Sequence, residues 1–258
     1  MYMQPAIVDF TSYKELITEA LNKINASSAL SNQKAILIKP NLIQSSPHPV
    51  TTPVECCEAI VLYIRNRTTS SANIIIAEGC GAMGYDTEKV FSDLGYCKLS
   101  ERLNIPLVNL NTTKTVKLTN SNCQIFKEFH MPEIAMNHYI ISVPVLKAHS
   151  LAMITGSLKN MMGFAPPKYY QTKGHWKKAA FHQNMHESIK ELNLYRKADL
   201  TILDARTGLS EYHLGGKECS PPVNKIIAGY DPYEVDRLAA NLLGMDWRDI
   251  PHLINEKS

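Results

Sequence analysis

Residues 34–42 read KAILIKPNL, and this stretch indicates the fold. Residues 35–38 are continuously apolar, which is typical of a strand that is buried on both faces of a parallel sheet. Pro40 ends the strand and places Lys39 and Asn41 at its carboxyl end. Ligands of open parallel sheets bind at this edge. The stretch therefore predicts both a buried strand and a position that faces a ligand.

Four further apolar runs predict the neighbouring strands. They read NIIIAEG (73–79), HYIISVPVLK (138–147), ADLTILDA (198–205) and KIIAGYD (225–231). If these strands run parallel to the first one, the polar residues at their ends reach the same edge of the sheet. The residues at these ends are Glu78, Lys147, Asp204 and Asp231.

Helical patterns separate the runs, and this alternation predicts an α/β fold, a three-layer sandwich with a mostly parallel sheet. The expected helices cover residues 11–25, 53–67, 86–104 (one helix or two short ones), 176–195 and 232–243. Two insertions interrupt the pattern, a β-hairpin near 114–129 and a long lid-like loop near 164–176. We expect residues 1–258 to form a single α/β domain.

The segment 134–186 carries six lysines and contains no Asp or Glu. The whole chain has a formal charge of +3, so the remainder of the chain is net negative. A segment so rich in cations is expected to meet an anion or to draw carboxylates from elsewhere in the fold. Lys147 and Lys159 sit among apolar residues, which favours a functional role for them. A solvated surface is the better interpretation of three other lysines: Lys173, Lys177 and Lys178.

Other motifs in the chain fall short of known site patterns. GCGAMG (79–84) fits GxGxxG, but the next predicted strand, PLVNL (106–110), ends without the carboxylate of a dinucleotide site. A glycine turn that lets the backbone approach a ligand or a strand is therefore favoured. His182 and His186 share a helix face, but HQNMH lacks the glutamate of HExxH, so no metal site is predicted. The six cysteines form no CxxC pair, and no GxSxG elbow supports a serine hydrolase.

The chain start, MYMQPAIVDF, has no basic region followed by an apolar core, so no signal peptide is predicted. No uncharged apolar run approaches the roughly 18–20 residues that a membrane span needs. We therefore expect a cytoplasmic protein without membrane contact.

Several motifs along the chain resemble those of the DUF362 family, an uncharacterised family of α/β proteins. They are IKPNL (38–42), VPVLKAHS (143–150), TGSLKNMMGFAPPK (155–168), ILDA (202–205) and AGYDPYEVDRLAANLLGMD (228–246). The resemblance extends from about residue 34 to about residue 250. It is specific because LKN followed by glycine, a later histidine, an aspartate that ends a strand and an Asp-x4-Asp pair occur in that order.

The resemblance implies an α/β fold and a pocket built from the matching positions. These positions are Lys39, Asn41, Lys147, Lys159, Asn160, His182, Asp204, Asp231 and Asp236. Many proteins of the family carry an added ferredoxin-type iron–sulfur module. The CxxCxxC pattern of that module is absent from this chain, so no intrinsic iron–sulfur cluster is expected.

These residues predict a site for a small anion that bears phosphate or carboxylate. Lysine ammonium groups bind such anions, and desolvation can bring the pKa of a lysine into the general-base range. Lys147, Lys159 and His182 are therefore the candidate catalytic groups. The other candidates would bind substrate: Lys39, Asn41, Glu78, Asn160, Asp204, Asp231 and Asp236.

The sequence thus favours an enzyme that acts on a small anionic metabolite, and it defines neither the reaction nor a cofactor. Two alternatives stay open. A nucleic-acid binder would use segment 134–186 with Tyr169, Tyr170 and Trp176 as stacking platforms. Against it, the segment contains no Arg and the chain is nearly neutral. An electron-transfer protein would need a separate iron–sulfur protein as its partner.

Overall fold

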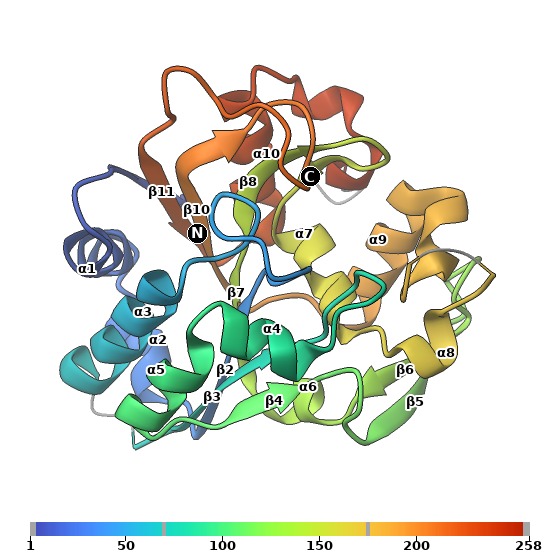
Figure 1. The fold of residues 1–258 in the computed structure, drawn as a ribbon, viewed down its shortest axis with the longest axis horizontal. Coiled ribbons are helices and arrows are strands. Elements are labelled where there is room, and N and C mark those ends of the chain that lie inside the picture. The colour runs from blue at the N-terminus through green and yellow to red at the C-terminus, as the bar shows by residue number, and fades with distance from the viewer. Residues whose placement is uncertain (1–3, 69–70, 174–175, 255–258) are drawn as a thin grey trace.

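The computed structural model describes residues 4–68, 71–173 and 176–254. Within them, nine strands form one mixed sheet in the order β1-β11-β10-β7-β2-β3-β4, and β8 pairs with β10 and β9 (Figure 1). The strands are β1 (Ala6–Asp9), β2 (Ala35–Pro40), β3 (Asn73–Glu78), β4 (Leu107–Asn109), β7 (Tyr139–Val143), β8 (Val145–His149), β9 (Met153–Thr155), β10 (Leu200–Leu209) and β11 (Lys225–Gly229). The predicted α/β fold class is confirmed.

The centre of the sheet is parallel, because β2, β3, β4, β7 and β10 all run in one direction. The chain proceeds from β2 outward through β3 to β4, and then returns to the other side of β2 with β7. This reversal creates a topological switch point between β2 and β7. A crevice forms outside the carboxyl ends of the strands at such a point, and ligands of open α/β sheets bind there.

Three strand predictions need correction. The run 198–205 does not end at Asp204, because β10 continues to Leu209. The run 138–147 is two strands, because β8 continues beyond Pro144 to pair with β10 and β9, whereas β7 pairs with β2. The last strand, β11, runs antiparallel to β10, so Asp231 leaves the sheet at the edge opposite to Lys39. An apolar run predicts that a segment is a strand, but it carries no information about the direction of that strand.

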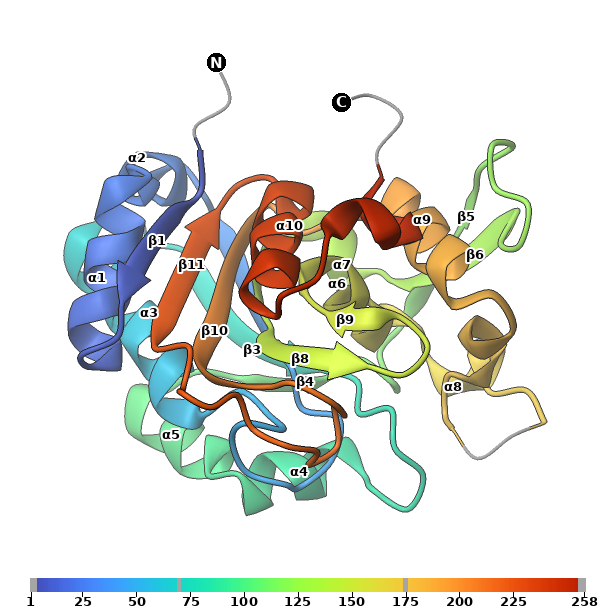
Figure 2. The same ribbon diagram turned by 90° about the horizontal axis from the view of Figure 1, so that it is seen from above.

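Helices cover both faces of the sheet (Figures 1 and 2). The helices are α1 (Tyr13–Lys23), α2 (Ala26–Ser31), α3 (Val54–Arg67), α4 (Thr87–Asp93), α5 (Tyr96–Leu103), α6 (Ile134–Asn137), α7 (Ser157–Asn160), α8 (Pro167–Tyr170), α9 (Met185–Tyr195) and α10 (Pro232–Leu242). Short 3₁₀ turns, η1 (Met161–Phe164) and η2 (Ala179–Asn184), follow α7 and precede α9. None of the helices in the described residues combines the length and the apolar character that crossing a membrane requires.

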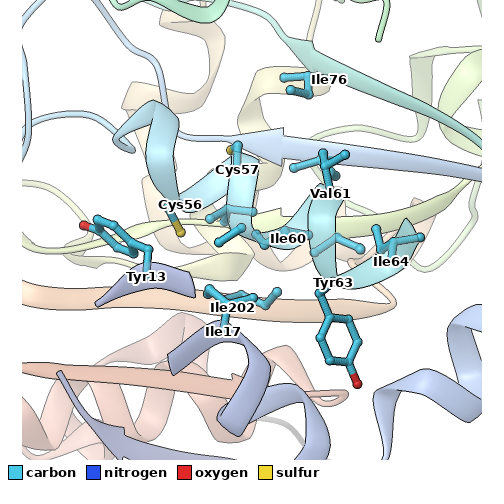
Figure 3. Close-up of a cluster of buried hydrophobic side chains, with 14 of the residues drawn as sticks. Tyr13, Ile17, Cys56, Cys57, Ile60, Val61, Tyr63, Ile64, Ile76 and Ile202 are labelled. Atoms are coloured by element: carbon cyan, nitrogen blue, oxygen red, sulfur yellow. The ribbon is translucent and has the colours of Figure 1, made fainter. Parts of the chain in front are cut away.

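The alternation of side chains along β2 explains the three layers. Ile36 and Ile38 belong to the apolar cluster that α1 and α3 form on one face, and Leu37 belongs to the cluster on the other face with residues of α7 and α9. Figure 3 shows the first cluster, where Ile17 of α1 and Ile60 of α3 lie near each other over the sheet. A strand that is apolar at successive positions is therefore needed to fill both layers.

The two predicted insertions lie beside the second cluster. β5 (Thr115–Thr119) and β6 (Glu128–Pro132) form an antiparallel hairpin, as predicted near 114–129. The expected loop near 164–176 contains the short helix α8, and its residues 174–175 lie outside the described residues. Tyr170 of this loop is buried, and its hydroxyl accepts a hydrogen bond from the N–H of His130 in the hairpin (2.7 Å).

Candidate functional site

A cavity of about 200 Å³ opens at the carboxyl ends of β2 and β3. Its lining includes Lys39 from the end of β2 and Glu78 from the end of β3. The other walls come from η1, η2, the turn between β8 and β9, the loop that follows β10, and Trp176. The cavity therefore lies beside the switch point of the sheet.

Lys39 and Glu78 form a buried ion pair at the base of this cavity. The Lys39 Nζ lies 2.8 Å from Glu78 Oε1 and also donates to Asn160 Oδ1 (3.1 Å) and to a backbone carbonyl. Glu78 accepts further hydrogen bonds from the N–H groups of Gly79 (2.7 Å) and Leu42 (2.8 Å). Both side chains are at most 4% exposed. Each buried charge is therefore paired and hydrogen-bonded, which is the condition for a stable buried ion pair. The pair connects β2 to β3, and Glu78 also connects them to the turns that follow.

A chain of hydrogen bonds extends this pair toward β8. Asn41 Nδ2 donates to Asn160 Oδ1 (3.2 Å), and the Lys147 Nζ donates to Asn41 Oδ1 (2.5 Å) and to the carbonyl of Val50 (2.6 Å). Burial, together with the nearby ammonium of Lys159, lowers the pKa of Lys147 to about 7. Lys147 does not line the cavity, so its contact with the site passes through Asn41.

Lys178 corrects one sequence interpretation. A solvated surface is the sequence-based prediction for this lysine, but its side chain lines the cavity and is only 4% exposed. Its Nζ donates to Asn111 Oδ1 (3.1 Å) and to the carbonyls of Gly163 (3.2 Å) and Ala165 (2.7 Å). Burial lowers the pKa of Lys178 to about 7. The prediction fails because the chain turns back toward the sheet just before η2.

Lys159 differs from the other three lysines. It lies on α7 and lines the cavity, but its ammonium forms no hydrogen bond or ion pair with any described residue. Burial, with a smaller effect of the Lys39 ammonium, lowers the pKa of Lys159 to about 8. A lysine with such a pKa is present in both protonation states near neutral pH. It can therefore hold an anion when charged and accept a proton when neutral.

Three imidazoles complete the lining near Lys159. They belong to His149 at the end of β8, His182 in η2 and His213 in the loop after β10. Burial and the charge of Lys159 lower the pKa of each one below its ordinary value. The sequence-based candidates include His182 but leave out His149 and His213, whose rings stack with centroids 3.8 Å apart.

Besides Lys147, three predicted site residues do not line the cavity. Asp231 is the N-cap of α10, where it accepts the N–H of Tyr233 (2.9 Å). Asp236 is buried below α7 and accepts the N–H groups of Ser157 (2.6 Å) and Leu158 (2.9 Å), so it stabilises the first turn of the helix that carries Lys159.

The third of these residues, Asp204, belongs to a separate buried network. It accepts a hydrogen bond from the hydroxyl of Tyr13 (2.6 Å), and its carboxylate lies 3.5 Å from the Nε2 of His48. The expectation that these carboxylates converge on the cavity is therefore wrong. Asp231 caps α10 and Asp236 lies within that helix, whereas Asp204 lies in the middle of β10, which continues to Leu209.

The glycine turn after β3 lies against the cavity. Gly79 and Gly81 belong to the lining, and a Cβ atom at Gly79 would collide with the carbonyl of Gly163. The turn also meets the segment after the expected lid, since the N–H of Lys177 donates to the carbonyl of Gly81 (3.1 Å). Close approach of backbones thus explains the need for glycine at position 79. The expected helix 176–195 is divided, since His182 lies in η2 and His186 lies in α9. The Nδ1 of His186 is 2.8 Å from the Nδ1 of His252.

The titration of Lys159 predicts a pH dependence of stability. An unfolded lysine binds a proton below pH about 10.4, whereas folded Lys159 does so only below about 8, so the unfolded state binds more protons between these values. Protonation of Lys159 therefore lowers the free energy of unfolding as the pH falls through this range. We expect the free energy of unfolding of wild type to rise by about 1 kcal/mol relative to Lys159→Met between pH 7 and pH 9. Urea denaturation at both pH values measures this difference, and parallel pH profiles would contradict it.

The fold and the cavity define an α/β protein with a candidate ligand site at the switch point of its sheet. The family model of DUF362, a domain of unknown function, matches residues 36–241, and the chain belongs to this family. No curated protein sequence gives a significant match.

A solved structure with a similar fold is that of the lactate racemase apoprotein from Thermoanaerobacterium thermosaccharolyticum. The TM-score is 0.55 and the sequence identity is 11%; the match covers 93% of this chain. This chain spans 57% of that structure. At this identity the likeness supports the α/β fold alone.

Proposed function

We propose that this protein is an enzyme that binds a small phosphate- or carboxylate-bearing metabolite in the cavity beside β2 and β3. The observation that carries the proposal is the Lys159 ammonium, which lines the cavity without a partner among the described residues. Lys159 is partly exposed, and a charge that is partly removed from water without a partner is unfavourable. An anionic ligand would supply the missing partner, and binding would raise the pKa of Lys159 toward its ordinary value.

The charge balance of the cavity supports an anionic ligand. Its lining contains three lysines, Lys39, Lys159 and Lys178, and Glu78 is the carboxylate among its described residues. Glu78 already accepts three hydrogen bonds, including the one from Lys39. The surplus of positive charge therefore has no counter-ion in the lining, and a site of this kind attracts anions.

The same residues supply groups for proton transfer. Lys159 has a pKa near 8, and His182, which also lines the cavity, has a lowered pKa. We assign these two residues the roles of ligand contact and proton carrier. The sequence also predicts Lys147 as a catalytic group. Because its ammonium contacts Asn41 and does not line the cavity, we assign it the role of positioning Asn41.

The related fold is consistent with a small carboxylate but does not carry the proposal. The similar structure is that of a lactate racemase apoprotein, and lactate is a small carboxylate. Because the identity is 11%, the chemistry of the cavity, rather than the likeness, defines the ligand class proposed here.

The nucleic-acid alternative loses support from the positions of the basic and aromatic side chains. Lys147 and Lys178 of segment 134–186 are buried, and so is Tyr170. Lys168, Tyr169 and Lys173 are exposed. Binding to a phosphate backbone needs exposed cations and exposed aromatic faces along a groove. The electron-transfer alternative stays a prediction from the sequence, since no feature of the described residues favours it.

Replacing Lys159 with methionine tests the proposed function. Wild type is expected to gain about 2.7 kcal/mol of stability at a ligand concentration 100 times its Kd, and the variant should lose this gain because the anion loses its main contact. Thermal melts against a panel of phosphates, carboxylates and sugar phosphates measure the effect. The control is Lys173→Met, which removes an exposed lysine from the same basic segment and should leave the stabilisation intact. Equal stabilisation of wild type and Lys159→Met would refute the proposal.

A further inference from the structure

Part of the cavity lining comes from the β8–β9 pair and from the loop after β10, and the proposed function uses neither segment. His149 ends β8, Thr155 ends β9, and His213 lies in the loop after β10. The two imidazole rings stack with an interplanar angle of 21°. His149 is 8% exposed and His213 is 6% exposed. Nothing in the ion-pair network of Lys39 explains why two histidines are packed together at this wall.

The hydrogen bonds of His149 define its tautomer. Its Nδ1 accepts the N–H groups of Leu151 (3.1 Å) and Ala152 (3.2 Å) from the β8–β9 turn. A ring nitrogen that accepts two N–H groups carries no proton, so the proton of the neutral ring is on Nε2. Burial and the Lys159 ammonium lower the pKa of His149 far below its ordinary value, and the ring is neutral at pH 7. His149 therefore offers a neutral N–H donor, which has no acceptor among the described residues.

His213 has the same character for a different reason. Its Nδ1 is buried and has no hydrogen-bond partner among the described residues. A buried N–H without an acceptor is rarer and less favourable than an unpaired acceptor, so the proton belongs on Nε2. Burial lowers the pKa of His213 to about 3, so this ring is neutral as well. The hydroxyl of Thr155 is also buried without a partner in the described part of the chain.

We infer that the stacked His149–His213 pair is a neutral hydrogen-bond donor subsite for an uncharged oxygen of the ligand, next to the anionic group that Lys159 holds. This inference rests on the proposed function and narrows its ligand class. The ligand is a small carboxylate or phosphate ester that carries an additional hydroxyl or carbonyl oxygen. Neutral N–H donors bind such an oxygen without adding charge to a lining that already contains three lysines.

Matched pairs of acids that differ by one hydroxyl test the inference. The pairs are acetate with glycolate, and ethyl phosphate with 2-hydroxyethyl phosphate. Calorimetric titration of wild type is expected to give a Kd about 3- to 10-fold lower for the hydroxylated member of the pair that binds. In His213→Ala this preference should fall to about 1. Equal affinity of wild type for both members, or an unchanged preference in His213→Ala, would overturn the subsite.

The outcomes separate this inference from the proposed function. Lys159→Met should lose both members of the pair, and absence of binding of all four acids to wild type overturns the proposed function and the subsite together. A measurement on wild type avoids any folding defect of the variant. Imidazole ¹⁵N NMR at pH 7.5 should give neutral Nε2–H tautomers for His149 and His213, and their signals should shift with the hydroxylated acid only. A charged ring, or an Nδ1–H tautomer of His213, would contradict the subsite.

Discussion

Replacing Glu78 with glutamine is expected to lower the free energy of unfolding by about 3–5 kcal/mol. The change leaves the Lys39 ammonium buried at 1% exposure without its counter-ion. The carboxylate of Glu78 accepts hydrogen bonds from the N–H groups of Gly79 and Leu42. In the variant, the amide N–H₂ group faces one of these donors and cannot accept its hydrogen bond. Small domains have only about 5–15 kcal/mol of stability, so the loss is a large part of the total. Urea denaturation of both proteins measures it.

A surface ion pair provides the matched control for this prediction. Glu128 lies 2.6 Å from the Lys117 ammonium in the β5–β6 hairpin, and both side chains are about half exposed. Glu128→Gln should change the free energy of unfolding by about 1 kcal/mol or less, because exposed pairs contribute little. Adding Lys39→Met to Glu78→Gln removes the unpaired charge, so the double variant should be less unstable than the sum of the two single variants. An effect of Glu78→Gln no larger than that of Glu128→Gln would mean that the buried pair does not support the fold.

The site residues that the strand pattern identifies correctly are those at the ends of parallel strands. Lys39 and Glu78 end neighbouring strands that run in the same direction, so the sheet alone brings them together. Asp231 also ends an apolar run, but β11 runs antiparallel and carries this residue to the opposite edge. The apolar pattern is the same in both cases, because burial on two faces requires apolar side chains whatever the direction of the strand.

The residues that the sequence leaves out reach the cavity by long-range packing. Lys178 is followed by Ala179, Ala180 and Phe181, so the apolar setting that favours Lys147 and Lys159 as functional residues applies to it as well. The adjacent Lys177 gives the pair the pattern of a charged surface, and this pattern hides the apolar signal. His213 has no comparable signal, since its loop is rich in glycine and polar residues and its position depends on the end of β10. Loop positions of this kind depend on tertiary contacts rather than on local pattern.

Replacing Gly163 with alanine should destabilise the protein by about 3–5 kcal/mol, although the change adds a single methyl group. The backbone of η1 passes so close to the ion pair that a Cβ atom at this position would collide with the Lys39 side chain and with Glu78 Oε1. The backbone of Gly163 does not require a left-handed conformation, so the effect comes from the collision. Either the pair or η1 must move, and both changes disturb the hydrogen bond from Lys178 to the carbonyl of Gly163.

Gly81→Ala is the control for this last effect, because it lies in the same cavity lining and its added Cβ atom would meet its nearest neighbour at 3.8 Å, an ordinary contact distance. We expect a change of about 1 kcal/mol or less for this variant. Gly163→Ala should also weaken binding of any anion that stabilises wild type, because the displaced Lys39 changes the shape and the charge of the cavity. If both variants unfold at the same urea concentration as wild type, the close packing of η1 on the ion pair does not contribute to stability. A loss of stability in Gly163→Ala but not in Gly81→Ala would show that the ion pair requires glycine at the third position of η1. This requirement explains why a glycine follows the Lys-Asn motif of α7 so closely.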